Sequence, residues 1–415
     1  MAKYSSHNGI SCGNITSING ITQTSIDNIN SLSLCSAESN PAMTRLAAAF
    51  NTGYVSQVPL ANIASKTVGG SPSAGEGGWQ DNMYRIKGAS STNKQLLRIS
   101  YGKDGSGNPH YVLVSDNDTD SLFQVSAANF YTEQHWTEIN ATGTGGSIKQ
   151  HKVLWGNDVW ISTGDISSNK VVLRSTNGTS WAAVDISAAL TDTTGGKAAF
   201  SASKMPGLTT DGNGTWWIAG GSQIYKSTDD GATWAFEADL SSLDVVGIRH
   251  MAFTNNTLVV LAKLTIDGGN SIRIITAAAS DTTDWGTPAL ANDGSGSDGK
   301  MSVTHTKLCA AGNGRVICID LGFCMSFDVN GKTATRSSDR INIADAGGAG
   351  GTGNCTDIAT DGEGNWYISC DGHGSGGDLV RSTDNGANWS AIVNDIVKSG
   401  DRDMEGLAVD RYLPL

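Results

Sequence analysis

Several residue types that mark particular protein classes are scarce in this chain of 415 residues. Only 7 residues are Pro and 16% are charged, and no apolar run reaches the ~18 residues that cross a bilayer. The 7 Cys are odd in number and thinly spread, which is not typical of a disulfide framework. Lys and Arg number 28 against 40 Asp and Glu, whereas nucleic-acid binders cluster cations. We therefore expect no membrane insertion and no nucleic-acid partner. Because the start also lacks an apolar secretory signal, we expect synthesis in a reducing cytoplasm.

Gly is abundant instead, at 52 residues, and most of the remaining polar residues are Ser, Thr, Asn and Asp. These residue types favour turns, because they adopt left-handed backbone geometry or bond to the local backbone. The 11 Trp, 9 Tyr and 8 Phe supply anchors for a core. The composition therefore predicts an all-β protein of many short strands.

Two segments repeat each other closely, over residues 209–234 and 359–389. Each contains an Asp-Gly-x-Gly turn between two apolar stretches, followed by a second turn, S-T-D-x-G-x-x-W. Weaker copies of the first turn fall at residues 104–107, 156–158, 255–256, 312–314 and 410–411. The resulting spacing of about 50 residues is the length of a four-stranded propeller blade.

The repeat count predicts a β-propeller of seven blades, with six as the alternative. The chain stops soon after one strand of the last repeat, so a strand from the N-terminal side has to complete that blade; Met83–Lys87 is the candidate. Closing the ring in this way removes open sheet edges. We expect a propeller over residues 82–415, a Gly/Ser-rich linker over 64–81 and a largely irregular arm over 1–63.

The second turn is similar to the Asp box, a motif of sialidases, some glycoside hydrolases, sortilin-type receptors and a photosystem assembly factor. The full copies are Ser227, Asp229, Gly231 and Trp234, and Ser382, Asp384, Gly386 and Trp389; a shortened copy is Ser175, Asn177, Gly178 and Trp181. The Asp side chains are expected to accept bonds from N–H groups of their own turns, the Gly residues to take positive φ, and the Trp rings to be buried between blades. These roles are structural, and no metal is needed.

The arm carries a loose repeat in which residues 15–21 (ITSINGI) are echoed by residues 26–32 (IDNINSL). Apolar residues at every third position fit neither an amphipathic helix nor an alternating strand, so we expect packing on a partner or threefold around an axis. Residues 36–50 are expected to form a short helix, capped by Ser39 or Asn40 with Pro41 at its first position. The arm resembles the N-termini of virion structural proteins of tailed bacteriophages.

That resemblance implies a virion protein, a tail fibre, appendage or decoration protein, that contacts other virion proteins through residues 1–63 as a homo-oligomer, with a trimer favoured. The propeller is then expected to bind a host-surface glycan or receptor without a cofactor. The candidate binding residues are Asp116, Asp118, Trp136, His373, Asp401, Arg402 and Asp403. Each is an aromatic, acidic or basic residue that we expect to be exposed in a loop on a ring face.

Two alternative functions remain open, a sialidase-like glycan hydrolase and a soluble scaffold or assembly factor. Against the hydrolase, Tyr84-Arg85-Ile86 is followed by Lys87 where sialidases have Pro, and no catalytic constellation stands out. We therefore predict that the protein is not an enzyme. The hairpin geometry places Cys309 opposite Cys318 and Cys355 opposite Cys370, and we predict buried reduced thiols at these positions.

Overall fold

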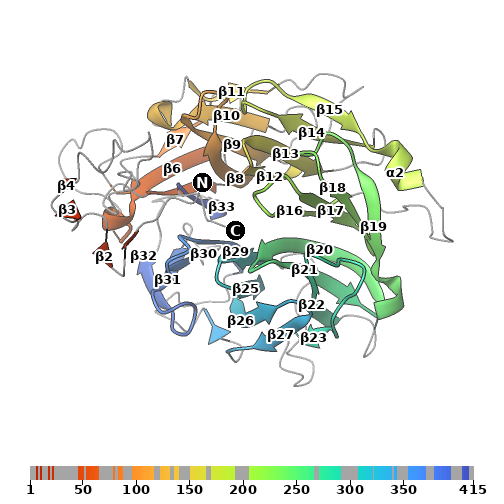
Figure 1. Cartoon of the computed structure of the whole chain (residues 1–415). Helices are drawn as coiled ribbons and strands as arrows, with labels where there is room; N and C mark the ends of the chain where they lie inside the picture. The colour runs from red at the N-terminus through yellow and green to blue at the C-terminus, as the bar shows by residue number, and fades with distance from the viewer. Residues whose placement is uncertain are drawn as a thin grey trace.

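The computed structural model describes the chain in segments. They are residues 6–7, 10–11, 17–18, 21–22, 45–50, 53–64, 78–79, 83–86, 96–115, 122–130, 135–139, 150–164, 170–191, 205–265, 271–290, 307–320, 322–338, 341–343, 354–370, 378–393 and 404–410. These segments form a seven-bladed β-propeller, as the repeats predict (Figure 1).

Three blades follow one another in the first half of the ring, each an antiparallel sheet of four strands. Blade 1 comprises β8 (Leu96–Lys103), β9 (Pro109–Ser115), β10 (Leu122–Ser126) and β11 (Thr137–Glu138). Blade 2 comprises β12 (Gln150–Gly156), β13 (Val159–Gly164), β14 (Val171–Ser175) and β15 (Ala182–Asp185). Blade 3 comprises β16 (Gly207–Thr210), β17 (Trp216–Gly220), β18 (Gln223–Ser227) and β19 (Ala235–Asp239).

The next three blades repeat the arrangement, again with the first strand at the ring axis. Blade 4 comprises β20 (Val245–Thr254), β21 (Thr257–Leu264), β22 (Ser271–Ala278) and β23 (Ala289–Leu290). Blade 5 comprises β24 (Lys307–Ala310), β25 (Arg315–Asp320), β26 (Phe323–Asn330) and β27 (Thr333–Arg336), with β28 (Ile341–Asn342) also on β26. Blade 6 comprises β29 (Cys355–Thr360), β30 (Trp366–Cys370), β31 (Asp378–Ser382) and β32 (Ser390–Val393).

Both ends of the propeller sequence build blade 7. Its strand order is β33 (Met404–Val409), β5 (Arg45–Phe50), β6 (Tyr54–Pro59) and β7 (Tyr84–Arg85). The predicted closing strand at Met83–Lys87 is confirmed as β7, the outermost strand. The arm boundary at residue 63 is wrong, because β5 pairs along its length with β33 and so belongs to the ring.

The linker boundary is wrong as well. Within the segment expected to be a linker, Trp79 is fully buried in the core cluster of blade 7. Its indole N–H donates to the Ile63 carbonyl at 2.9 Å, and its own carbonyl accepts from the Ser56 hydroxyl at 2.8 Å. A residue with these contacts is part of the propeller, and the Gly and Ser content around it concealed that role.

Residues 45–50 form a strand, so the predicted helix over residues 36–50 is wrong in its described part. The segment RLAAAF has high helix propensity, but propensity is a weak prior that tertiary packing overrides. Ala47, Ala48 and Ala49 are fully buried because β5 lies between β33 and β6 and small side chains fit between adjacent blades. Residues 36–44 lie outside the described segments.

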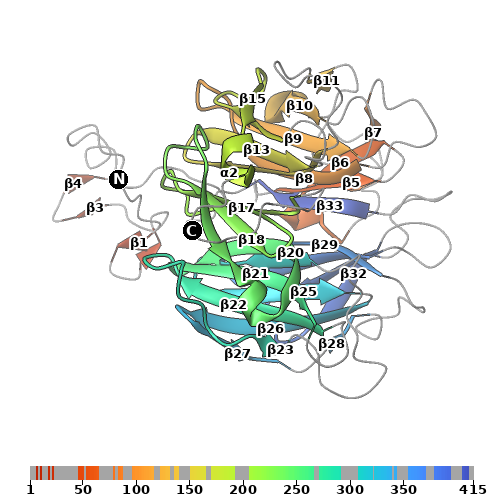
Figure 2. The same cartoon turned by 90° about the vertical axis from the view of Figure 1, so that its right-hand side faces the viewer.

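The blades pack face to face, and this explains their burial pattern. Second strands such as β13 and β17 are buried at every position, because each is covered by a neighbouring blade on both faces. Outer strands such as β15 and β27 contain only exposed and half-buried residues. The blades stand side by side around the ring (Figure 2). The core is consequently a ring of separate clusters, one between each pair of neighbouring blades.

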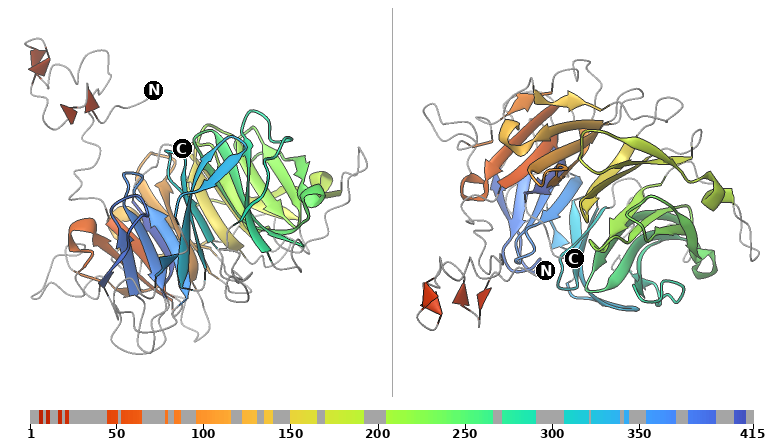
Figure 3. Two further views of the ribbon diagram at one scale, coloured as in Figure 1. Left: turned by 90° about the horizontal axis from the view of Figure 1, so that it is seen from below. Right: turned by 45° about the horizontal axis from the view of Figure 1, so that its top comes forward.

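The described parts of the arm are two small hairpins. They are β1 (Ser6–His7) with β2 (Ile10–Ser11), and β3 (Ser17–Ile18) with β4 (Ile21–Thr22). Within the described segments these strands pair only with each other, and they lie beside the ring (Figure 3). The described helices are η4 (Leu60–Asn62), η5 (Ala127–Asn129), α2 (Ser187–Thr191) and η7 (Leu240–Leu243). No helix in the described part of the chain is long and apolar enough to span a membrane.

Candidate functional site

The two complete S-T-D-x-G-x-x-W turns share one hydrogen-bond pattern. In blade 6, Asp384 accepts from the Ser382 hydroxyl at 2.8 Å and from the Asn388 backbone N–H at 2.8 Å. The Ser382 hydroxyl oxygen in turn accepts from the Gly386 N–H at 2.9 Å. Asp229 and Ser227 make the same bonds in blade 3. The predicted local role of both Asp side chains is confirmed.

The Gly of each turn sits where the turn meets the preceding blade. Gly386 has a φ of 86°, and a Cβ there would stand 2.4 Å from Cδ1 of Ile317 on β25. Gly231 has a φ of 77° and the same distance to Cδ1 of Ile161 on β13. Glycine is therefore required twice over, by backbone conformation and by the approach of the neighbouring blade.

The shortened turn of blade 2 keeps the pattern with Asn in place of Asp. Asn177 accepts from the Thr179 and Ser180 N–H groups at 3.0 and 2.8 Å, and Gly178 has a φ of 72°. The Ser175 hydroxyl accepts from the Gly178 N–H, and the Trp181 indole donates to the Gly178 carbonyl. Trp181 and Trp389 are buried, whereas Trp234 is half-buried. These turns consequently connect neighbouring blades.

We expect Asp384→Ala to cost about 1–2 kcal/mol of unfolding free energy at neutral pH, because it removes the acceptor for two N–H or O–H donors. The hydrogen bonds from Asn388 and Ser382 lower the pKa of Asp384 to about 2. A lowered pKa contributes stability above the ordinary value near 3.8, and this contribution is lost as pH falls toward 2. Thermal unfolding at pH 7 and pH 3 should therefore show a smaller difference between wild type and variant at pH 3. Thr383→Ala, an exposed change in the same turn, is the control, and an equal loss there would contradict the assignment.

The structure gives a mixed outcome for the predicted binding residues. Asp116, Asp118, His373, Asp401, Arg402 and Asp403 lie outside the described residues. Trp136 is described and is only 3% exposed. Its ring packs on Phe130 and its indole N–H donates to the Phe130 carbonyl at 3.2 Å. Its assignment as an exposed aromatic binding residue is wrong, since it is a core side chain of blade 1.

The Cys predictions hold for one pair in geometry. Cys355 lies directly opposite Cys370 on β29 and β30, and both are buried free thiols. Cys309 faces Ile317 and Cys318 faces Leu308, so these two thiols are offset by one residue of register and only roughly opposite. Cys318 is a buried thiol, whereas Cys309 is half-buried, so the predicted burial of Cys309 is wrong. Burial raises the pKa of Cys309 to about 12, which keeps this thiol neutral.

A cavity of about 640 Å³ lies on the ring axis, within the size range of small-molecule sites. It is lined by the first strands of the blades. Its walls include apolar residues such as Val153, Ile358 and Leu407, and Asp158 and Asp211 line it from the turns of blades 2 and 3. Six ionisable residues of the first strands line it as well: Arg98, Tyr101, Lys152, His250, Cys309 and Asp357.

Irregular pairing brings several of these side chains to the axis. The register between first and second strands shifts just before Arg98 in β8, Lys152 in β12, His250 in β20 and Asp357 in β29. Such a bulge turns the strand locally and re-aims a side chain. A ring of ionisable groups from different blades results, and it contains candidate functional residues that sequence reasoning missed.

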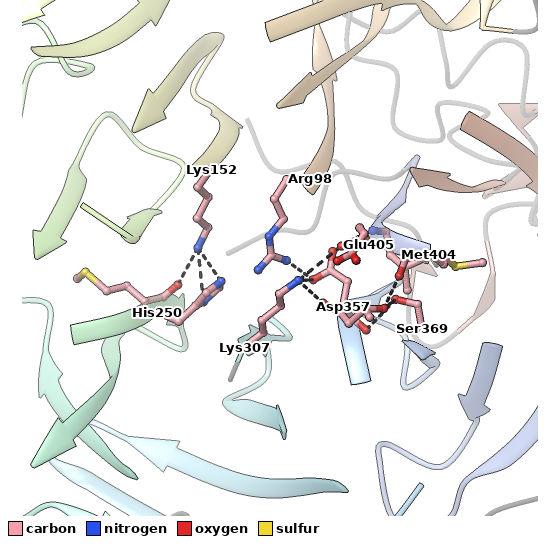
Figure 4. A network of polar contacts seen from close by, with 11 residues as sticks. Arg98, Lys152, His250, Lys307, Asp357, Ser369, Met404 and Glu405 are labelled. Carbon is pink, nitrogen blue, oxygen red and sulfur yellow. Dashed lines mark hydrogen bonds and ion pairs between the residues drawn. The ribbon is translucent and has the colours of Figure 1, made fainter. Parts of the chain in front are cut away.

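On one side of the ring, charges neutralise each other. Arg98 forms an ion pair with Asp357, and the ammonium of Lys307, below the cavity, lies 4.0 Å from the same carboxylate (Figure 4). The second oxygen of Asp357 accepts from the Leu407 backbone N–H at 2.9 Å. Burial lowers the pKa of Lys307 to about 8, so this group remains mainly protonated at neutral pH. Both oxygens of the carboxylate are therefore engaged by the protein.

On the other side, two basic groups meet. The Lys152 ammonium nitrogen lies 3.2 Å from Nε2 and 3.5 Å from Nδ1 of His250, and 3.4 Å from the Met251 carbonyl oxygen (Figure 4). Both side chains are buried, at 8% and 7% exposure. Burial, and then their mutual repulsion and that of Arg98 and Lys307, lower the pKa of His250 well below its usual value; burial and Arg98 do the same for Lys152. Perturbed groups of this kind in a cavity mark a candidate functional site.

The sequence does contain a signal for this ring. Lys307, Asp357 and Gly207 each stand five residues before the Gly that begins the first turn of their blades, Gly312, Gly362 and Gly212. Lys152 and His250 occupy the corresponding positions before Asn157 and Asn255. An alignment of the blades by their first turn would have isolated this column. The presence of charged residues in these strands would not have identified the column, because the shift in strand pairing that aims the side chains inward has no sequence signature.

Comparisons with known proteins identify the fold and no family. No protein-family model matches the chain, and no curated protein matches its sequence. Among solved structures, a hypothetical selenium-binding protein from Sulfolobus tokodaii is similar with a TM-score of 0.59 at 9% identity, covering 90% of this chain and 94% of its own. YCF48 from Cyanidioschyzon merolae is similar with a TM-score of 0.48 at 14% identity, covering 75% and 94%. The first of these similarities, at 9% identity, establishes a shared fold alone.

Proposed function

We propose that this chain is a recognition protein whose propeller binds a ligand at its axis without transforming it. The axial cavity carries this proposal, because it combines apolar walls with a small number of convergent polar groups, which is the composition of ligand sites. Asp357 is engaged by Arg98, Lys307 and a backbone N–H. A carboxylate held in this way is suited to position cations and poorly suited to act as a free general base.

The setting we propose is a virion of a tailed phage, with a host-surface glycan as the ligand. The support is the sequence of the arm, whose I-x-x-I-N-G pattern resembles virion N-termini, and the Asp-box turns, which occur in glycan-binding propellers. Because the ring begins at Arg45, the segment available for contact with other virion proteins is residues 1–44. Several copies on one particle would convert weak glycan affinity into avidity.

Two measurements test this proposal. Immunogold electron microscopy of particles from the source lysate, with antibody raised against the propeller, should label tails, fibres or capsids; intact particles without label would contradict the virion setting. The purified full chain should also bind host polysaccharide without releasing reducing ends. Release of reducing ends would establish the glycan hydrolase instead, and a monomeric protein absent from particles would favour the scaffold.

A further inference from the structure

Among the basic groups around the axial cavity, Lys152 and His250 have the least negative charge close to them. Arg98 and Lys307 share the carboxylate of Asp357, and Glu405 also lies near Lys307. Lys152, by contrast, contacts a neutral carbonyl and another basic group, and no carboxylate of the described residues pairs with it. A buried cation without an anionic partner is costly, so such a group is either neutral or awaits an anion from outside.

The architecture explains why the two groups meet. Lys152 belongs to blade 2 and His250 to blade 4, and blade 3 lies between them with Gly207 at the corresponding position. A Cβ at Gly207 would stand 2.8 Å from Sδ and 3.0 Å from Cγ of Met251. The Gly therefore lets β20 approach β16 closely, and the side chains of Lys152 and His250 meet across blade 3 at the edge of the cavity (Figure 4).

We propose that the Lys152–His250 pair is a binding site for the carboxylate group of an organic ligand, and that the pair takes up one proton from solvent when the ligand binds. The cavity walls include the apolar residues Val153, Ile358 and Leu407, so an organic anion fits better than an inorganic ion. The site stands on its own, because it concerns the ligand's carboxylate whether this group is free or carried by a sugar.

The charges that face the pair determine the direction of the proton transfer. They are Arg98 on β8, Lys307 and the neutral thiol of Cys309 on β24, and Asp357 on β29. Two contacting basic groups near Arg98 and Lys307 cannot both be protonated at neutral pH, because like charges disfavour each other's charged form. A bound carboxylate supplies the missing negative charge and raises the pKa of the pair. Binding therefore draws a proton from solvent, and affinity should rise as pH falls.

The test is calorimetric titration of the full chain with sodium acetate, sodium D-glucuronate and neutral D-glucose at millimolar concentrations. We expect glucuronate to bind and glucose not to bind, with affinity rising by up to about tenfold per pH unit as pH falls. Repeating the titration in two buffers of different ionisation enthalpy should give an uptake of up to one proton. If acetate binds with the same affinity as glucuronate, the site recognises the carboxylate alone. If glucuronate binds more tightly than acetate, the sugar ring also contributes to affinity.

Three variants separate binding from stability. Lys152→Met should weaken glucuronate binding at least tenfold while leaving thermal unfolding unchanged or raised, because it removes a buried amine and keeps the stem. His250→Gln should preserve binding and reduce the proton uptake, since Lys152 then keeps its own proton. Lys332→Met, which removes a cation from an exposed turn of blade 5, is the matched control.

The proposal fails under any of three results: glucose binding as strongly as glucuronate, wild-type affinity in Lys152→Met, or glucuronate binding without proton uptake. Each of these leaves the wider proposal of glycan recognition to its own test with host polysaccharide. Conversely, the protein could bind glucuronate or acetate with proton uptake and yet not bind host polysaccharide. That result would support the carboxylate site and contradict the proposal that the ligand is a host-surface glycan.

Discussion

Deletion of residues 1–63 should abolish folding of the propeller, whereas deletion of residues 1–44 should leave it intact. The longer deletion removes β5 and β6, two of the four strands of blade 7. It takes away four large, fully buried apolar side chains, Leu46, Phe50, Val55 and Val58. At about 1.5–3 kcal/mol each, their loss amounts to about 6–12 kcal/mol, which is comparable with the whole stability of a domain.

The deletion also opens the ring. β33 would lose its antiparallel partner and present an unpaired edge, and unpaired edges aggregate. Circular dichroism with thermal unfolding and size-exclusion chromatography would measure both effects. We expect a cooperative transition near the wild-type temperature for the shorter deletion and none for the longer one. A cooperative, monomeric protein lacking residues 1–63 would contradict the assignment of β5 and β6 to the ring.

The sequence predicted the repeating part of this fold because repetition amplifies a weak signal. One Gly-rich turn is poor evidence for a hairpin, but the same turn in successive blades fixes both the blade length and the ring. The repeat did not predict β5 and β6 of blade 7, because the strands of this blade come from both ends of the propeller sequence. RLAAAF carries no turn motif of the repeat, and its alanines favour a helix until β33 and β6 lie on either side of it.

The contact between Lys152 and His250 could not be predicted for a related reason. The local bonds of Asp229 and Asp384 follow from a few consecutive residues, and the structure confirms them. Lys152 and His250 are 98 residues apart in the sequence and meet only because the ring closes and blade 3 offers Gly207 between them. Trp136 illustrates the converse error, since an aromatic residue in a polar segment resembled a surface anchor and proved to be core.

The close approach of blades 1 and 2 leads to the second large expected effect, in Gly102→Ala. A Cβ at Gly102 would stand 2.3 Å from Cγ and 2.6 Å from Cβ of Trp155, and 2.5 Å from Cζ2 of Trp160. Trp160 cannot move away easily, since it is fully buried and its indole N–H donates to the Lys103 carbonyl at 2.8 Å. We expect a loss of about 2–3 kcal/mol, the upper range for overpacking a core.

Gly107→Ala is the matched control, because it makes the same chemical change in the adjoining turn. Gly107 has a φ of 83° and no atom within 4 Å of its Cβ position, so only backbone strain of about 1–2 kcal/mol applies. Urea unfolding of the wild type and both variants gives the comparison. Combining Gly102→Ala with Trp155→Leu should recover part of the loss, because the smaller side chain leaves room for the new methyl group. Two results together would contradict this prediction: Trp155→Leu recovers none of the lost unfolding free energy, and Gly102→Ala costs no more than Gly107→Ala. Steric contact with the two indoles would then not set the separation of blades 1 and 2.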